Sequence, residues 1–159
     1  MSKATRATMA LDRARVTYTL HSYRYDPDAE RIGMQAAESL GVAPEIVLKT
    51  LMAQVDGKPV CVIVPSDREV SMKRLAAAFG AKSAQMMRPD DAERLTGYHV
   101  GGISPFGQKK SVPTAIEIAA LTHQSVFING GQRGLQLRLR PADARDVLKA
   151  KAAPLVADA

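Results

Sequence analysis

The chain has 159 residues and 46% hydrophobic content, which fit one globular domain spanning 1–159 with a core from about 5 to 150. It contains no run of the ~20 apolar residues that a membrane helix needs, and its first residues lack the apolar stretch of a signal peptide, so we expect a cytoplasmic protein with no membrane partner. The net charge of +6 favours a polyanionic partner such as nucleic acid, while the 4% aromatic content argues against binding mainly by base stacking.

The first third of the chain predicts a helix, a strand and a short second helix. Residues 2–15 carry no Gly or Pro and place alanines and a leucine at helical spacing, with Ser2 as a candidate cap. The alternation of apolar residues in 16–25 predicts a strand. The segment 32–41 then predicts a short helix that Gly41 closes.

The middle of the chain predicts a β-hairpin followed by two helices. Segments 48–55 and 59–65 are apolar and flank an Asp-Gly turn at 56–57, a combination that is typical of a tight hairpin. Ser71 is expected to cap the first helix, and Pro89 is expected to open the second.

The last third predicts three strands, at 113–118, 125–130 and 135–139, and a final helix at 141–150. Strands and helices are mixed without regular βαβ alternation, and the paired strands resemble hairpins. This order favours an α+β fold with a mixed or mostly antiparallel sheet. Only the two ends, 1–2 and 152–159, are expected to be loosely held.

The glycine-rich stretch GYHVGGISPFGQKK at 97–110 is the first candidate site. It comes close to a phosphate-binding P-loop, but Gln108 stands where the lysine should follow the glycine. Pro105 removes a backbone donor, and Pro113 follows before a helix could run. The sequence therefore argues against a nucleotide-hydrolysing P-loop.

A different use of the glycines remains open in this stretch. Gly101 and Gly102 carry no Cβ, so a ligand can approach their backbone, and their N–H groups could polarise a carbonyl oxygen. Lys109 and Lys110 would then contact phosphate near the mouth of the site. The alternative is a plain turn with solvated lysines.

Lys49 and Tyr23 are the next candidates. In EIVLKTLMAQV, alternation places Lys49 on the same strand face as apolar residues, where a lysine is costly unless it is paired or lines a pocket. The alternative is a lysine at the strand edge that extends to water. Tyr23 is either half-buried packing or a hydroxyl that orients a ligand.

Known catalytic sets are absent from the sequence. The histidines are scattered, no spacing resembles a metal site, and no nucleophile elbow occurs. The one cysteine, Cys61, lies in the apolar run PVCVIV and is expected to be a buried, inert thiol. Adjacent Asp90 and Asp91 would diverge on a helix and favour its N-terminus. Any reaction is therefore expected to lack a metal, a cofactor and a dedicated protein base.

Together these motifs resemble the YbaK family of free-standing bacterial Cys-tRNA(Pro) deacylases. The resemblance runs from about 5 to 150 and is carried by TLHSY (19–23), VLKTL (47–51), TGYHVGGISPFGQKK (96–110), PT (113–114) and GGQRGLQL (130–137). The chain is also similar to the editing domain inserted in bacterial prolyl-tRNA synthetases, but the GQKK and GGQRG segments favour the YbaK branch.

The resemblance implies a single α+β domain with a mixed, mostly antiparallel, barrel-like sheet flanked by helices. It also implies that the chain removes cysteine from tRNA(Pro) that prolyl-tRNA synthetase has mischarged, because a small pocket cannot strongly reject a side chain of similar volume. The expected partners are this mischarged tRNA and the synthetase. The substrate's own thiol would attack the ester carbonyl and expel the tRNA as a cyclic thiolactone, so that the enzyme supplies position and oxyanion stabilisation.

Site residues follow from the same resemblance. Lys49 is expected near the phosphate or aminoacyl end, Tyr23 in the pocket wall, and the Gly101 N–H near the ester carbonyl. The expected substrate-binding residues are Gly102, Ile103, Ser104, Pro105, Asn129, Gly130, Gly131, Lys109 and Lys110.

Asn129 departs from the family pattern, which has a serine before the Gly-Gly pair. Its amide can also donate and accept hydrogen bonds but is larger and could reshape the pocket. Alternatively, Asn129 serves only the geometry of the hairpin. The departure leaves two further hypotheses: a deacylase for another small amino acid, such as Ala-tRNA(Pro), and a non-catalytic module that binds tRNA or the synthetase.

Overall fold

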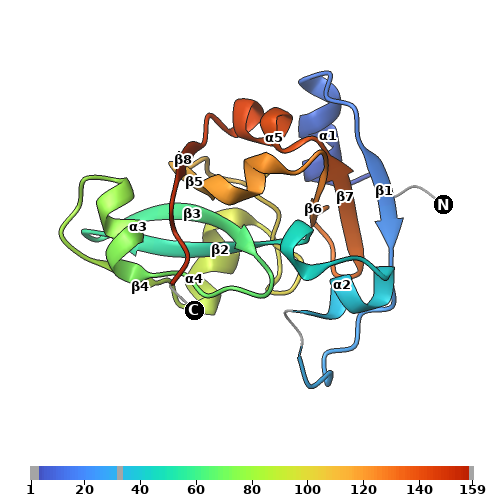
Figure 1. Ribbon diagram of the computed structural model, residues 1–159, viewed down its shortest axis with the longest axis horizontal. Helices are drawn as coiled ribbons and strands as arrows, with labels where there is room; N and C mark the ends of the chain where they lie inside the picture. The colour runs from blue at the N-terminus through green and yellow to red at the C-terminus, as the bar shows by residue number, and fades with distance from the viewer. Residues whose placement is uncertain (1–3, 32–33, 158–159) are drawn as a thin grey trace.

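The computed structural model describes residues 4–31 and 34–157, and it has the predicted α+β organisation (Figure 1). Its five α-helices within the described residues are α1 (Arg6–Arg13), α2 (Gln35–Leu40), α3 (Met72–Ala78), α4 (Pro89–Thr96) and α5 (Pro141–Leu148). Its strands there are β1 (Thr19–Ser22), β2 (Leu48–Val55), β3 (Lys58–Pro65), β4 (Ala84–Met86), β5 (Thr114–Glu117), β6 (Val126–Asn129), β7 (Leu135–Leu139) and β8 (Lys151–Ala153).

The strands form two sheets that lie side by side in Figure 1. The larger has the order β4-β2-β3-β5-β8 and the smaller has the order β1-β7-β6. Pairing is antiparallel except at β3-β5 and β5-β8. A single bridge between Val47 and Phe127 joins the sheets, which do not close, so the sheet arrangement is barrel-like only in a loose sense.

The predicted hairpin is confirmed as β2 and β3. Asp56 and Gly57 both have positive φ, 47° and 81°, as a two-residue turn between right-twisted strands requires. The main core lies between the two sheets and includes Phe106, Ile116 and Ile128. A second cluster packs α3 against the other face of the larger sheet.

The helices begin and end at the predicted signals, except that the first helix is capped by a different residue. Ser71 accepts a hydrogen bond from the Arg74 N–H, and Pro89 begins α4. Thr5, with Thr8, forms a capping box at α1. The predicted cap, Ser2, lies outside the described residues. Residues 32–33 of the predicted second helix also lie outside them, and α2 ends at Gly41 as expected.

The expectation of a loose C-terminal end was wrong for most of 152–159. Lys151–Ala153 pairs as β8 with β5, and Leu155 is fully buried. The Glu117 carboxylate accepts hydrogen bonds from the N–H groups of Leu155 and Val156 at 2.8 and 3.1 Å. A buried acceptor and an apolar anchor therefore hold a segment whose composition gave no strong signal.

No helix within the described residues is long and apolar enough to cross a membrane.

Candidate active site

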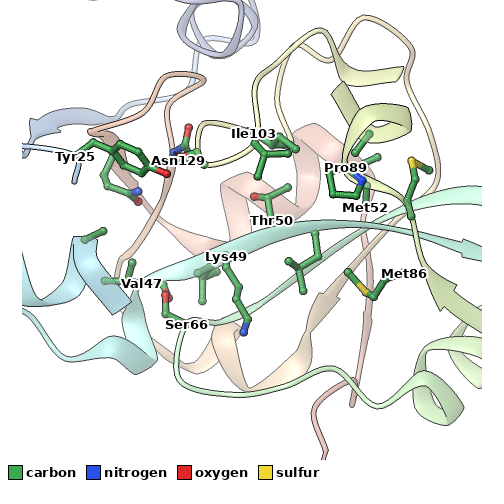
Figure 2. Close-up of a pocket in the computed structure, with 18 of the residues that line it drawn as sticks. Tyr25, Val47, Lys49, Thr50, Met52, Ser66, Met86, Pro89, Ile103 and Asn129 are labelled. Atoms are coloured by element: carbon green, nitrogen blue, oxygen red, sulfur yellow. Dashed lines mark hydrogen bonds between the residues drawn. The ribbon is translucent and has the colours of Figure 1, made fainter. Parts of the chain in front are cut away.

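A cavity of about 270 Å³ lies at the open edge of β2 (Figure 2). It forms there because β4 pairs only with Ala53–Val55, the last residues of β2, and leaves the strand's first half uncovered on that side. Most of the lining comes from β2, the end of β6, the loop that follows α4 and the segment that enters α4. The segment after β1, α2, the residue after β3, the end of β4 and β7 complete it. Strand edges carry unpaired backbone groups, so a cavity at this place is suited to binding a ligand.

Lys49 occupies one side of this edge. It lies on the strand face that also presents Leu51, Ala53 and Val55 to the second core cluster, as the alternation predicts. The side chain is 22% exposed, and its Nζ lies 3.7 Å from Oε1 of Glu69, whose side chain is 88% exposed. An ion pair with such an exposed carboxylate is weak. The ammonium group can therefore pair with an anionic ligand.

Thr50 lines the same cavity from the opposite face of β2. Figure 2 shows its side chain directed toward Ile103, whereas Lys49 points to the other side of the strand, near Ser66. The Ser66 hydroxyl donates to the Val47 carbonyl oxygen, so it is engaged within the protein.

Tyr23 lines the cavity from the segment that follows β1, and it is half-buried. Burial of the phenol raises its pKa, and a side-chain hydrogen bond from Gln136 opposes this rise. The hydroxyl is therefore protonated at neutral pH and can donate to a ligand. Tyr25 also lines the cavity, and the Arg133 guanidinium lies over its ring, 5.4 Å from the ring centre.

Gly101 reaches the cavity from the loop after α4. Its φ of +91° favours glycine, and a Cβ at this position would lie 2.7 Å from the Tyr25 hydroxyl. Within the described residues its N–H makes no hydrogen bond, whereas the N–H of Gly102 donates to the His99 carbonyl at 2.8 Å. Of the two glycines, Gly101 is thus the one whose backbone donor remains available to a ligand.

Asn129 lines the cavity at the end of β6, but its amide is engaged by the protein. Its Oδ1 accepts from the N–H groups of Gly131 and Gln132 at 2.7 and 3.2 Å, and its Nδ2 donates to the Gly101 carbonyl at 3.3 Å. Asn129 therefore closes the β6–β7 turn and ties this turn to the glycine loop. This geometry agrees with the hairpin interpretation of the residue.

Residues 26–147, which include the cavity lining except Tyr23 and Tyr25, match the family model of the aminoacyl-tRNA editing domain. The chain belongs to the aminoacyl-tRNA editing domain family.

Two curated proteins are similar to this editing domain in sequence, and one solved structure is similar to it in fold. It is 34% identical over 142 residues to the "Putative Cys-tRNA(Pro)/Cys-tRNA(Cys) deacylase EbsC" of Enterococcus faecalis, covering 86% of this chain and 84% of that one. It is 30% identical over 110 residues to the proline–tRNA ligase of Acidithiobacillus ferrooxidans, covering 69% of this chain and 19% of the ligase. Its fold matches the crystal structure of "a putative trans-editing enzyme for prolyl tRNA synthetase" with a TM-score of 0.81 and 19% identity, covering 99% and 100% of the two chains.

Seven residues that the sequence placed at the site stand outside the cavity lining of the editing domain: Gly102, Ser104, Pro105, Lys109, Lys110, Gly130 and Gly131. Ser104 and Pro105 are buried, and the Gln108 amide donates to the Ser104 carbonyl at 3.0 Å, so both residues shape the loop. Gly130 pairs with Leu135 across the turn, and Gly131 packs against Tyr98. These residues hold the cavity walls in position. Ile103, by contrast, is part of the lining.

Lys109 and Lys110 lie at a separate, more open hollow of about 430 Å³, next to Arg94 and Leu95. Their N–H groups donate to the Thr96 and Leu95 carbonyls at 2.8 and 3.3 Å, which fixes this pair against the end of α4. Both side chains are exposed. The structure therefore separates the two lysines from the cavity.

Thr50 and Gln136 are lining residues that sequence reasoning missed. In LQLRL the alternation assigns Gln136 to the polar face of β7, which would ordinarily face water. In the editing domain this face is covered, and Gln136 is only 5% exposed. For Thr50, the sequence did offer one signal, because Thr50 directly follows the candidate Lys49.

Among the described residues, none of those that line the cavity is a His, Cys, Asp or Glu. Cys61 is buried as expected, and burial raises the pKa of its thiol to about 12. Among the residues that the structure describes, no three His, Cys, Asp or Glu side chains gather closely enough to hold a metal ion. Asp91 pairs with Arg94 on α4, away from the cavity.

Proposed function

We propose that this editing domain is a trans-editing deacylase that removes cysteine from mischarged Cys-tRNA(Pro). The single observation that carries the proposal is the composition of the cavity as the described residues form it: a weakly paired lysine, a free glycine N–H and hydroxyl groups, with no His, Cys, Asp or Glu. Such a site can position an ester and stabilise an oxyanion, but the wall carries no general base from these residue types. The nucleophile then comes from the substrate.

The uncovered edge of β2 lets the substrate contact both faces of the strand. The ammonium group of Lys49 pairs with a phosphate of the tRNA acceptor end on one side. The aminoacyl group enters the side lined by Thr50, Ile103 and Tyr23, where Figure 2 shows Thr50 and Ile103 directed toward each other. The ester carbonyl lies near the Gly101 N–H.

The reaction is a displacement within the substrate. The cysteine thiol loses its proton, its sulfur forms a bond to the ester carbonyl carbon, and the bond from that carbon to the ribose oxygen breaks. The proton ends on the ribose oxygen, and the products are a cyclic thiolactone and free tRNA. The Gly101 N–H stabilises the negative charge that develops on the carbonyl oxygen, and the cavity wall holds the reacting atoms together.

A reaction that requires the thiol of the substrate explains how one small cavity can distinguish cysteine from proline. An apolar pocket cannot strongly reject a side chain of similar volume, so binding alone discriminates poorly. Proline carries no thiol, and its ester therefore survives even when it enters the cavity. The similarity to part of a proline–tRNA ligase and to EbsC supports the choice of substrate and of prolyl-tRNA synthetase as cytoplasmic partner.

The test is a deacylation panel with Cys-tRNA(Pro), Ala-tRNA(Pro), Pro-tRNA(Pro) and Cys-tRNA(Cys), with and without prolyl-tRNA synthetase. The proposal expects rapid loss of cysteine from tRNA(Pro) and no loss of proline. Loss of alanine instead would make the chain a deacylase for another amino acid. Salt-dependent tRNA binding with no loss of any ester would make it a non-catalytic module.

A further inference from the structure

Two polar atoms in the cavity wall have no hydrogen-bond partner among the described residues: Thr50 Oγ1 and Gln136 Oε1. Both are shielded from solvent. The large majority of buried polar side-chain atoms in proteins are paired, because an unpaired one has lost its water without compensation. Both residues line the one cavity, so a ligand bound there is a candidate source of their missing partners.

The surroundings of Gln136 define which kind of partner it lacks. In the strand register Gln136 stands opposite Asn129 of β6 on one side and His21 of β1 on the other. Its hydrogen bond to Tyr23 lowers the pKa of that phenol, as donation by the amide nitrogen would. The amide oxygen then remains without a partner, and an amide oxygen can only accept hydrogen bonds. The missing partner is therefore a donor.

The aminoacyl part of the ester carries one strong donor group, its α-amino group. The hydroxyl of Thr50 and the amide oxygen of Gln136 can both accept a hydrogen bond from it. Lys49 lies on the opposite face of β2, and its positive charge disfavours a second cation on its own side. The amino group of a bound ester is therefore best placed on the side of Thr50.

We propose that Gln136 and Thr50 together bind the α-amino group of the aminoacyl ester. The inference rests on the proposed deacylase function and names the part of the substrate that these two residues recognise. Binding requires each oxygen, which is shielded from solvent in the structure, to turn toward the cavity. Holding the amino group leaves the thiol of a cysteine side chain free to reach the carbonyl carbon.

The test compares Cys-tRNA(Pro) with 3-mercaptopropionyl-tRNA(Pro), which keeps the thiol and the ester but lacks the amino group. Rates are measured as kcat/KM over the buffer rate for each ester. Gln136→Met preserves the side-chain length, and Thr50→Val preserves the side-chain shape. Gln85→Met is the matched control, because Gln85 is exposed on β4 and, within 4–31 and 34–157, its side chain bonds only to Gln54.

The wild-type protein is expected to prefer the cysteinyl ester by roughly tenfold or more, since hydrogen bonds to a charged group are the strong ones. Each cavity variant is expected to lose most of this preference by slowing the cysteinyl ester, with the deaminated ester within about twofold of wild type. The control keeps the preference. Thr50→Val should also retain the melting temperature, since Oγ1 bonds to nothing in the described protein.

Two outcomes overturn the inference in distinguishable ways. If wild type cleaves Cys-tRNA(Pro) but the folded variants keep the full preference for the amino group, the assignment of Gln136 and Thr50 is wrong and the deacylase stands. If wild type accelerates loss of neither ester, the deacylase and the assignment fall together. Should Gln136→Met fail to fold, Thr50→Val decides the question alone.

Discussion

Lys49 and Thr50 are neighbours in β2, and their side chains leave the strand on opposite faces while both line one cavity. In the middle of a sheet two such residues would face separate layers. They share a cavity here because β4 covers only the far end of β2. The short edge strand is thus the feature that lets one ligand contact a cation on one face and a hydroxyl on the other.

Removal of the cation by Lys49→Ala should lower kcat/KM for the ester by roughly 100-fold, which is the size expected for a charge-assisted contact to phosphate. Stability should change by less than about 1 kcal/mol, because the partner Glu69 is largely exposed and such pairs are weak. Deacylation kinetics and a thermal melt on the same sample measure both. Lys58→Ala, in the exposed hairpin, is the control. Normal turnover by a folded Lys49→Ala protein would refute the role.

Neutralising the remote basic pair should weaken tRNA binding and leave the chemical step intact. Lys109 and Lys110 are exposed and lie outside the cavity, so the double change to glutamine removes only phosphate contacts. The slope of log Kd against log salt should fall by up to about 2, one for each contact. Single-turnover rates at saturating enzyme should match wild type. The prediction is wrong if the double variant binds tRNA as tightly as wild type but has a lower single-turnover rate at saturating enzyme.

Adding one methyl group at Gly101 should harm the reaction more than the fold. Gly101→Ala strains a positive φ and brings Cβ to 2.7 Å from the Tyr25 hydroxyl, inside the cavity. Gly41→Ala strains a similar φ of +67° with open space around it, so it isolates the backbone cost of about 1–2 kcal/mol. Both variants should lose similar stability in denaturant unfolding, but only Gly101→Ala should lose activity. Equal activity in the two would remove Gly101 from the site.

Asp56 should make stability depend on pH in the acid range. Hydrogen bonds from the Lys82 and Ser83 N–H groups hold its pKa below the ordinary 3.8. A depressed carboxyl pKa stabilises the folded state above the unfolded pKa, and this contribution is lost as the pH falls through the folded value. Asn also tolerates the positive φ found here.

The comparison of wild type with Asp56→Asn by unfolding at several pH values checks this linkage. The difference in free energy of unfolding should be constant above about pH 5 and should shrink below about pH 4. A difference that stays the same down to pH 2 would show that the charge of Asp56 has no part in it.

The sequence predicted the framework of the fold because its signals are local. The Asp-Gly turn at 56–57, the cap at Ser71 and the proline at 89 each act within a few residues, and each lies where it was expected. The capture of the C-terminal segment by Glu117 was missed, since it joins residues 38 apart in the chain.

The same distinction holds for the candidate site. Lys49 was found because one polar residue interrupts an apolar strand face, which is a local pattern. Gln136 was missed because its position in LQLRL reads as a solvent-facing residue, and only the tertiary packing covers it. Whether Gly101 or Gly102 keeps a free N–H depends on the turn to His99, which the glycine pattern does not specify.

The most direct test of the central claim compares Cys-tRNA(Pro) with the same tRNA carrying S-methylcysteine, which adds one methyl group to the cysteine side chain and so blocks the sulfur. The account predicts strong acceleration of cysteine loss, with the thiolactone as the first product seen by mass spectrometry after a rapid quench. It predicts no acceleration for the methylated ester. Equal acceleration of both esters, with free amino acid as the first product, would contradict attack by the substrate's thiol.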